Sequence, residues 1–118
     1  MARMPAESFR IAGRAGASAR FHILAVTGAI TTLTSPAFLE AALAASTPVL
    51  IIDLSEAPSV DSMAVGALVR VFVSRNRSGR KLALVGLNRR VINVLKITGV
   101  DLLFDTYPTV PEAESALS

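Results

Sequence analysis

The pattern of hydrophobic positions changes along the first half of the chain, from a strand pattern to a helical one and then to an unbroken apolar run. Residues 9–14 (FRIAGR) alternate apolar and polar side chains and residues 21–27 (FHILAVT) are rich in branched and aromatic ones, so with the intervening AGAS turn they predict a β-hairpin. Apolar residues at helical spacing after Ser35 and Pro36 predict a helix that Ser35 caps and that ends near residues 46–48. The unbroken apolar run VLIIDL, residues 49–54, predicts a strand buried in the middle of a sheet.

In the second half, helical and strand periods alternate. A helical pattern starts at Asp61 or Ser62 and stops at Gly79. The remaining elements follow in the order strand, helix, strand, helix: KLALVG at 81–86, NRRVINVLKITG at 88–99, LLFDTY at 102–107 and TVPEAESAL at 109–117. Asn88 is the expected cap of the first of these helices and Gly99 its terminator. Pro111 opens the last one, with Glu112 and Glu114 expected in its first turn.

This order predicts an α/β fold with a mixed sheet of four or five strands and about four helices. The opening hairpin is antiparallel, and strands joined through helices run parallel. We expect the strand at 49–54 to be central and the following helix to begin within two residues of Ser62. Residues 1–8 are predicted to be a flexible N-terminus and residues 9–118 a single domain.

The composition indicates a folded chain and limits the kinds of site that the chain can form. The 118 residues suffice for one domain, and with 52% hydrophobic and 18% charged residues the chain can bury a core. No apolar stretch approaches the roughly 20 residues that span a bilayer, so we expect a cytoplasmic protein without membrane insertion. With no cysteine and the single His22, we expect no disulfide, metal site or cofactor.

The net charge of +3 is unevenly distributed, because the segment 70–96 contains no acidic residue. Its basic residues are Arg70, Arg75, Arg77, Arg80, Lys81, Arg89, Arg90 and Lys96. Phe72 is the only aromatic residue in the segment 70–96. Aromatic side chains that could stack on bases are therefore scarce, and we expect no direct binding of nucleic acid. A solvated polar face is the first interpretation and contact with an acidic protein the second.

Catalysis finds little support in the residues. A nucleophilic Ser62 would need a histidine base, and the only candidate, His22, lies in a predicted strand. The glycines of a nucleophile elbow and both common phosphate-binding loops are missing. Asp53, Glu56 and Asp61 could hold magnesium, although caps and turns explain such acids more simply. We therefore predict a protein that is not an enzyme.

Asp61 and Ser62 stand together at the start of the predicted helix 61–79, where either side chain could cap the first turn. The surrounding sequence resembles the STAS domain, the fold shared by bacterial anti-sigma factor antagonists and the tails of sulfate transporters. The resemblance covers nearly the whole chain and rests on matches at Gly28, Thr34, Pro36, Leu39, Asp53, Leu54, Asp61, Ser62, Gly66, Gly79 and the segment VLKITGVDLLFDTY.

The resemblance implies a function for this junction. Ser62 aligns with the serine that partner kinases phosphorylate in the family, and residues Asp61, Ser62, Met63, Ala64, Val65 and Gly66 would form the partner-binding surface. The implied partner is an anti-sigma factor with serine kinase activity, from which the unmodified protein releases a sigma factor; a phosphatase would reset the switch. We expect a monomer or weak dimer.

Two departures from the family pattern affect this site. Met63 and Ala64 replace the family's second serine and its glycine, and Ala29, Ile30 and Thr31 replace an acidic Glu-Leu-Asp segment. Two alternatives stay open: an accessory STAS subunit of a membrane transport or other signalling complex, and an enzyme, for which loss of hydrolysis in Ser62→Ala would be the test.

Overall fold

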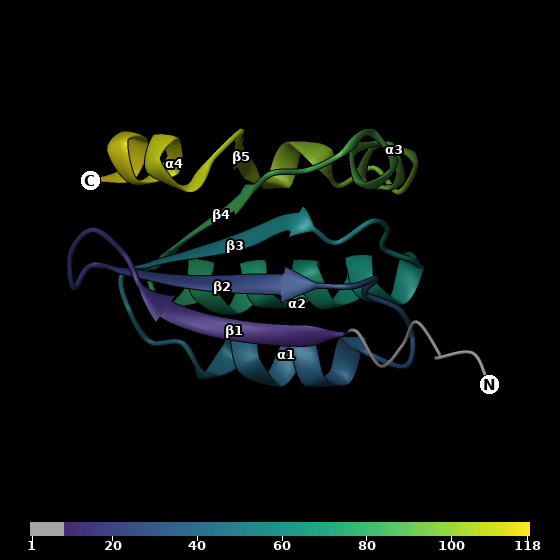
Figure 1. Cartoon of the computed structure of the whole chain (residues 1–118), viewed down its shortest axis with the longest axis horizontal. Helices are drawn as coiled ribbons and strands as arrows, with labels where there is room; N and C mark the ends of the chain where they lie inside the picture. Colours follow the sequence, from purple (N-terminus) through teal and green to yellow (C-terminus); the bar gives the residue numbers. More distant parts are fainter. Residues whose placement is uncertain (1–8) are drawn as a thin grey trace.

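The computed structural model describes residues 9–118 and shows the α/β fold that the sequence predicts (Figure 1). The predicted flexible segment 1–8 lies outside the described residues. The strands are β1 (Arg10–Ala15), β2 (Phe21–Thr27), β3 (Val49–Glu56), β4 (Lys81–Val85) and β5 (Asp105–Tyr107). The helices are α1 (Ser35–Ala44), α2 (Ser62–Arg77), α3 (Arg89–Ile97) and α4 (Val110–Leu117), with a 3-10 turn η2 at Asp101–Leu103.

The five strands form one mixed sheet in the order β1-β2-β3-β4-β5. The β1–β2 hairpin is antiparallel, and β2, β3, β4 and β5 run parallel because a helix connects each to the next. In the register of the sheet, Ile51 of β3 pairs with Ile23 on one side and Ala83 on the other. The prediction that residues 49–54 form the central strand is confirmed.

Each face of the sheet buries its own cluster of apolar side chains. Leu24, Leu50, Ile52 and Leu84 point to the face that α1, α2 and α3 cover, where they meet helix residues such as Leu68. The opposite face carries Ile23, Ile51 and Ala83 under α4. This arrangement explains the unbroken apolar run in β3, since alternate residues enter different cores. Figure 1 shows α1 and α2 side by side along the hairpin.

Several predicted details differ from the structure. Ser35 is not a cap: it is the first helical residue of α1, and Thr34 occupies the N-cap position. Leu102 and Leu103 belong to the 3-10 turn, because Leu103 N donates to Val100 O, so β5 is confined to three residues. Glu114 lies beyond the first turn of α4, where its carboxylate accepts a hydrogen bond from Ala17 N in the hairpin turn.

Candidate functional site

Asp61 starts α2, and Ser62 is its first helical residue, as predicted. The Asp61 backbone is extended, and its Oδ1 accepts a hydrogen bond from Ala64 N at 2.9 Å. Val65 N donates to Asp61 O at 3.0 Å and closes the first turn. Asp61 therefore satisfies one of the amide groups that a helix leaves unpaired at its start.

The second carboxylate oxygen of Asp61 holds a segment that is distant in sequence. Asp61 Oδ2 accepts hydrogen bonds from Thr32 N at 2.9 Å and from Thr32 Oγ1 at 3.4 Å. The backbones join as well, because Asp61 N donates to Ile30 O and Ile30 N donates to Ser59 O, both at 3.1 Å. Asp61 thus connects the start of α2 to the loop that follows β2.

Threonine hydroxyls fix the conformation of that loop, residues 28–34. Thr34 Oγ1 donates to Ala29 O at 2.9 Å and accepts from Thr31 N at 2.8 Å. Thr31 Oγ1 accepts from Leu33 N at 3.1 Å. The side chain of Leu33 is 84% exposed. A loop held by internal hydrogen bonds therefore presents an apolar side chain to solvent directly after Thr32, the residue that binds Asp61.

The six predicted partner-binding residues divide into accessible and buried ones. Ser62, Met63 and Gly66 are exposed, Met63 at 57%, and Asp61 is half-buried. Ala64 and Val65, by contrast, lie in the core. A helix turns about 100° per residue, so consecutive positions cannot all face outward. The predicted surface is therefore smaller than expected: Ala64 and Val65 lie beneath it, and the other four residues are accessible.

The surface around Gly66 is open. A Cβ atom built there would meet no heavy atom within 4 Å, so nothing in the described part of the chain covers this point of α2. The accessible part of the candidate site is therefore Asp61, Ser62, Met63 and Gly66 at the start of α2, with Thr32 and Leu33 on the neighbouring loop. We call this set the Ser62 surface.

Sequence reasoning missed Thr32 and Leu33. Thr32 is separated from Asp61 by 29 residues, so their contact depends on the parallel pairing of β2 with β3. The only sequence feature that pointed to this loop is the alignment of residues 29–31 with the acidic segment of the family. That alignment does not indicate which side chains of the loop reach Asp61.

His22 packs within the hairpin and not beside Ser62. A Cβ atom at Gly13 would lie 2.9 Å from His22 Nε2, which places the imidazole against β1. The acidic residues also have separate roles, because Asp53 Oδ1 accepts from Ser55 N at 3.0 Å while Asp61 caps α2. Within residues 9–118, no three His, Asp or Glu side chains gather in a way that could hold a metal ion.

Arg75 does not belong to the basic surface that the sequence suggested for residues 70–96. Its side chain is 3% exposed, and its guanidinium donates to Lys81 O at 2.8 Å, to Ala45 O at 3.1 Å and to Thr47 O. Burial, with a smaller contribution from the charge of Arg80, lowers the pKa of Arg75 to about 10. The other seven basic residues of the segment are exposed.

Comparisons with known proteins bear on the fold and the family of the chain. A proposed anti-sigma factor antagonist from Thermotoga maritima is 38% identical over 60 residues, which is 51% of this chain and 53% of that relative, so the match spans about half of its length. A crystal structure of a proposed anti-sigma factor antagonist from T. maritima superposes with a TM-score of 0.81 at 24% identity, over 90% of this chain and 92% of that chain.

The same fold occurs within a larger protein. The murine solute carrier 26 family member A9, an anion transporter, superposes with a TM-score of 0.76 at 22% identity, over 87% of this chain and 18% of the transporter. None of the helices within residues 9–118 combines the length and the hydrophobicity that a membrane span requires. The family model of the STAS domain matches residues 14–113, and the chain therefore belongs to the STAS domain family.

Proposed function

We propose that this protein is an anti-sigma factor antagonist. In this proposal the unmodified Ser62 surface binds a cytoplasmic anti-sigma factor with serine kinase activity and so releases the sigma factor that the kinase holds. Phosphorylation of Ser62 by the bound kinase ends the interaction, and a phosphatase restores it. The observation that carries the proposal is the exposed Ser62 hydroxyl at the first position of α2, beside a capping aspartate, in a chain of the STAS family.

The physical basis of the switch is local. A phosphate on Ser62 adds about −1.5 to −2 charge at neutral pH. The N-terminus of α2 favours this charge, so the folded chain tolerates it. The Asp61 carboxylate stands on the adjacent residue and already accepts hydrogen bonds from Ala64 and Thr32, so the phosphate adds a second anion to the same small surface. Partner binding would then have to desolvate both anions, which weakens the contact without a change of fold.

The remainder of the Ser62 surface suits a protein partner. Met63 and Leu33 offer exposed apolar side chains, and covering them with a partner would remove apolar surface from water, which favours association. Gly66 lies one turn after Met63 on α2 and has open space where a side chain would be, so a partner backbone can approach closely there. Apolar contacts of this kind raise the cost of a neighbouring charge, because the charge must lose its water when the surfaces meet.

The test combines modification and binding. Incubation with the cognate kinase and ATP should place one phosphate on the peptide that contains Ser62, as read by mass spectrometry. Ser62→Ala should still bind the kinase and Ser62→Glu should bind it at least tenfold more weakly, measured by titration calorimetry. Ser74→Glu is the matched control, because it adds the same charge to an exposed position of α2 about three turns away. Phosphate on Ser59, Ser74 or Ser78, or equal affinities for Ser62→Glu and the wild type, would contradict the proposal.

A second candidate function comes from the transporter that shares the fold. In that case the protein is an accessory STAS subunit and binds a transport complex through the same helix. The two functions differ in their response to the kinase: an accessory subunit stays unphosphorylated, and its binding is insensitive to the charge of Ser62→Glu.

A further inference from the structure

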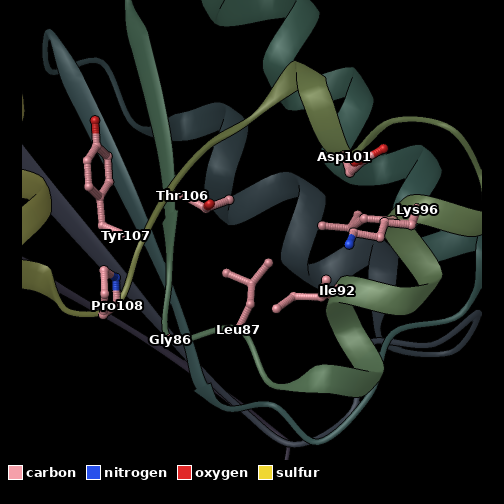
Figure 2. Close-up of a pocket in the computed structure, with 9 residues that line it drawn as sticks. Gly86, Leu87, Ile92, Lys96, Asp101, Thr106, Tyr107 and Pro108 are labelled. Carbon is pink, nitrogen blue, oxygen red and sulfur yellow. The ribbon is translucent and has the colours of Figure 1, made fainter.

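A pocket of about 590 Å³ lies away from the Ser62 surface, outside the carboxyl ends of β4 and β5 (Figure 2). Its walls come from the loop after β4, from α3, from the 3-10 turn η2, and from β5 with the residue that follows it. This is the edge at which parallel sheets commonly bind ligands, and the volume falls within the usual range for small-molecule sites. No residue of the Ser62 surface lines the pocket.

Gly86 gives the pocket its shape on the sheet side. Its backbone is left-handed, with φ of +73°, and a Cβ atom there would lie 2.8 Å from Ser55 Cβ. Only glycine fits both conditions without strain. The chain therefore turns sharply after β4 while touching β3, and it directs Leu87 into the pocket, where Figure 2 shows Leu87 next to Ile92.

The lining separates into an apolar part and a charged part. Leu87, Ile92 and Leu95 supply the apolar surface, and Ile92 remains 38% exposed although it belongs to a folded helix. Lys96 and Asp101 are the two charged residues of the lining, and Figure 2 shows both on the α3 side. Lys96 is exposed and Asp101 half-buried, so each can reach a ligand at the mouth of the pocket. Thr106, on the opposite wall, adds a hydroxyl group.

We propose that this pocket binds a small zwitterion with an apolar body, of the class of the apolar amino acids. Lys96 would bind the carboxylate, Asp101 would accept hydrogen bonds from the ammonium group, and the apolar side chain would lie against Leu87, Ile92 and Leu95. One cation and one anion in a lining that is otherwise mostly apolar match this combination of groups.

The same charges argue against polyanions. A nucleotide would bring several negative charges to a lining in which Asp101 cancels the charge of Lys96. A purely apolar molecule would leave both charged groups without partners while removing part of their water. The proposal is independent of the function proposed for the Ser62 surface.

The test uses ¹⁵N-labelled full-length protein and four probes of defined chemistry. L-phenylalanine should cause saturable amide shifts in residues 87–96 and 101–107. Phenethylamine lacks the carboxylate and 3-phenylpropionate lacks the ammonium group, so each should bind at least fivefold more weakly than L-phenylalanine. GMP, the dianionic phosphate probe, should also bind at least fivefold more weakly.

Variants with matched controls assign the contacts. Lys96→Met should remove the advantage of L-phenylalanine over phenethylamine, and Asp101→Asn should reduce its advantage over 3-phenylpropionate. Arg90→Met and Asp105→Asn change the same charges on exposed residues outside the lining and should leave the affinity unchanged. The proposal is overturned if L-phenylalanine gives no saturable shifts, if GMP binds as tightly, or if the lining variants and the controls behave alike while all four remain folded.

Discussion

Replacing Asp61 with alanine should destabilise the fold by a predictable amount. The change leaves two amide groups without their acceptor, Ala64 N at 2.9 Å from Oδ1 and Thr32 N at 2.9 Å from Oδ2. Loss of an N-cap costs about 0.5–2 kcal/mol and loss of one further hydrogen bond about 0.5–1.5 kcal/mol. We therefore expect Asp61→Ala to lower the free energy of unfolding by roughly 1–3.5 kcal/mol.

Asp61→Asn separates the two contributions. Its amide oxygen can still cap α2 by accepting from Ala64 N, but its NH₂ group would then face the Thr32 N–H, and two donors cannot pair. The asparagine variant should thus keep most of the cap and lose about 0.5–1.5 kcal/mol, the part that depends on Thr32. Asn88→Ala allows the loss of the Asp61 cap to be compared with the loss of the cap of α3, where Asn88 Oδ1 accepts a hydrogen bond from Val91 N at 2.9 Å.

Urea unfolding followed by circular dichroism measures these differences as shifts of the midpoint at constant slope. Hydrogen exchange locates them, because the Thr32 amide should exchange faster in both Asp61 variants and the Ala64 amide chiefly in Asp61→Ala. Equal stability of Asp61→Ala and the wild type, or unchanged protection of Thr32 in both variants, would refute the connection between α2 and the loop 28–34.

Three further predictions concern other parts of the fold. Arg75→Met should cost about 1–5 kcal/mol in urea unfolding, because the loss of three hydrogen bonds outweighs the relief of burying a charge. Since burial lowers the folded pKa of Arg75 to about 10, below its value in the unfolded chain, Arg75 is charged in both states up to about pH 9. The difference from the wild type should therefore be flat between about pH 5 and 9 and should grow in favour of the wild type above about pH 10. Gly86→Ala should cost about 1–3 kcal/mol more than Gly79→Ala, because both glycines have positive φ but only Gly86 has a neighbour within 4 Å. His22→Gln should leave kinase affinity in calorimetry unchanged, and a loss of affinity in the folded variant would show that the imidazole contributes to the site.

The parts of the structure that depend on local pattern could be predicted from the sequence. The run 49–54 is apolar on both faces because its alternate residues enter two different cores, and that is visible without knowledge of its neighbours. The start of α2 was equally clear, since a capping residue precedes a change to helical period. The pair Leu102–Leu103 was less clear, because two apolar residues fit a strand and a 3-10 turn equally well.

The parts that depend on contacts between distant segments could not be predicted. Arg75 is charged and follows a surface-like pattern, yet its long side chain reaches one carbonyl group after α1 and another on the first residue of β4, which only the folded chain brings together. The family motif gave six consecutive site residues, whereas the helical period places Ala64 and Val65 in the core. A motif records which residues recur, and the geometry of the helix decides which of them a partner can touch.

Two capping side chains connect neighbouring loops at the edge of the sheet on which Ser62 lies. Because β2, β3 and β4 are parallel, the loops that follow them meet at one edge of the sheet. Asp61 caps α2 and binds Thr32 in the loop after β2, while Asn88 caps α3 and donates to Ala57 O at 3.3 Å and Pro58 O at 3.0 Å in the loop after β3. The loop that presents Ser62 is therefore held from both sides, and its position depends on side-chain hydrogen bonds between loops as much as on α2 itself. A partner that binds the Ser62 surface consequently meets a surface formed before it arrives, so affinity can respond to one added charge without a rearrangement of the fold.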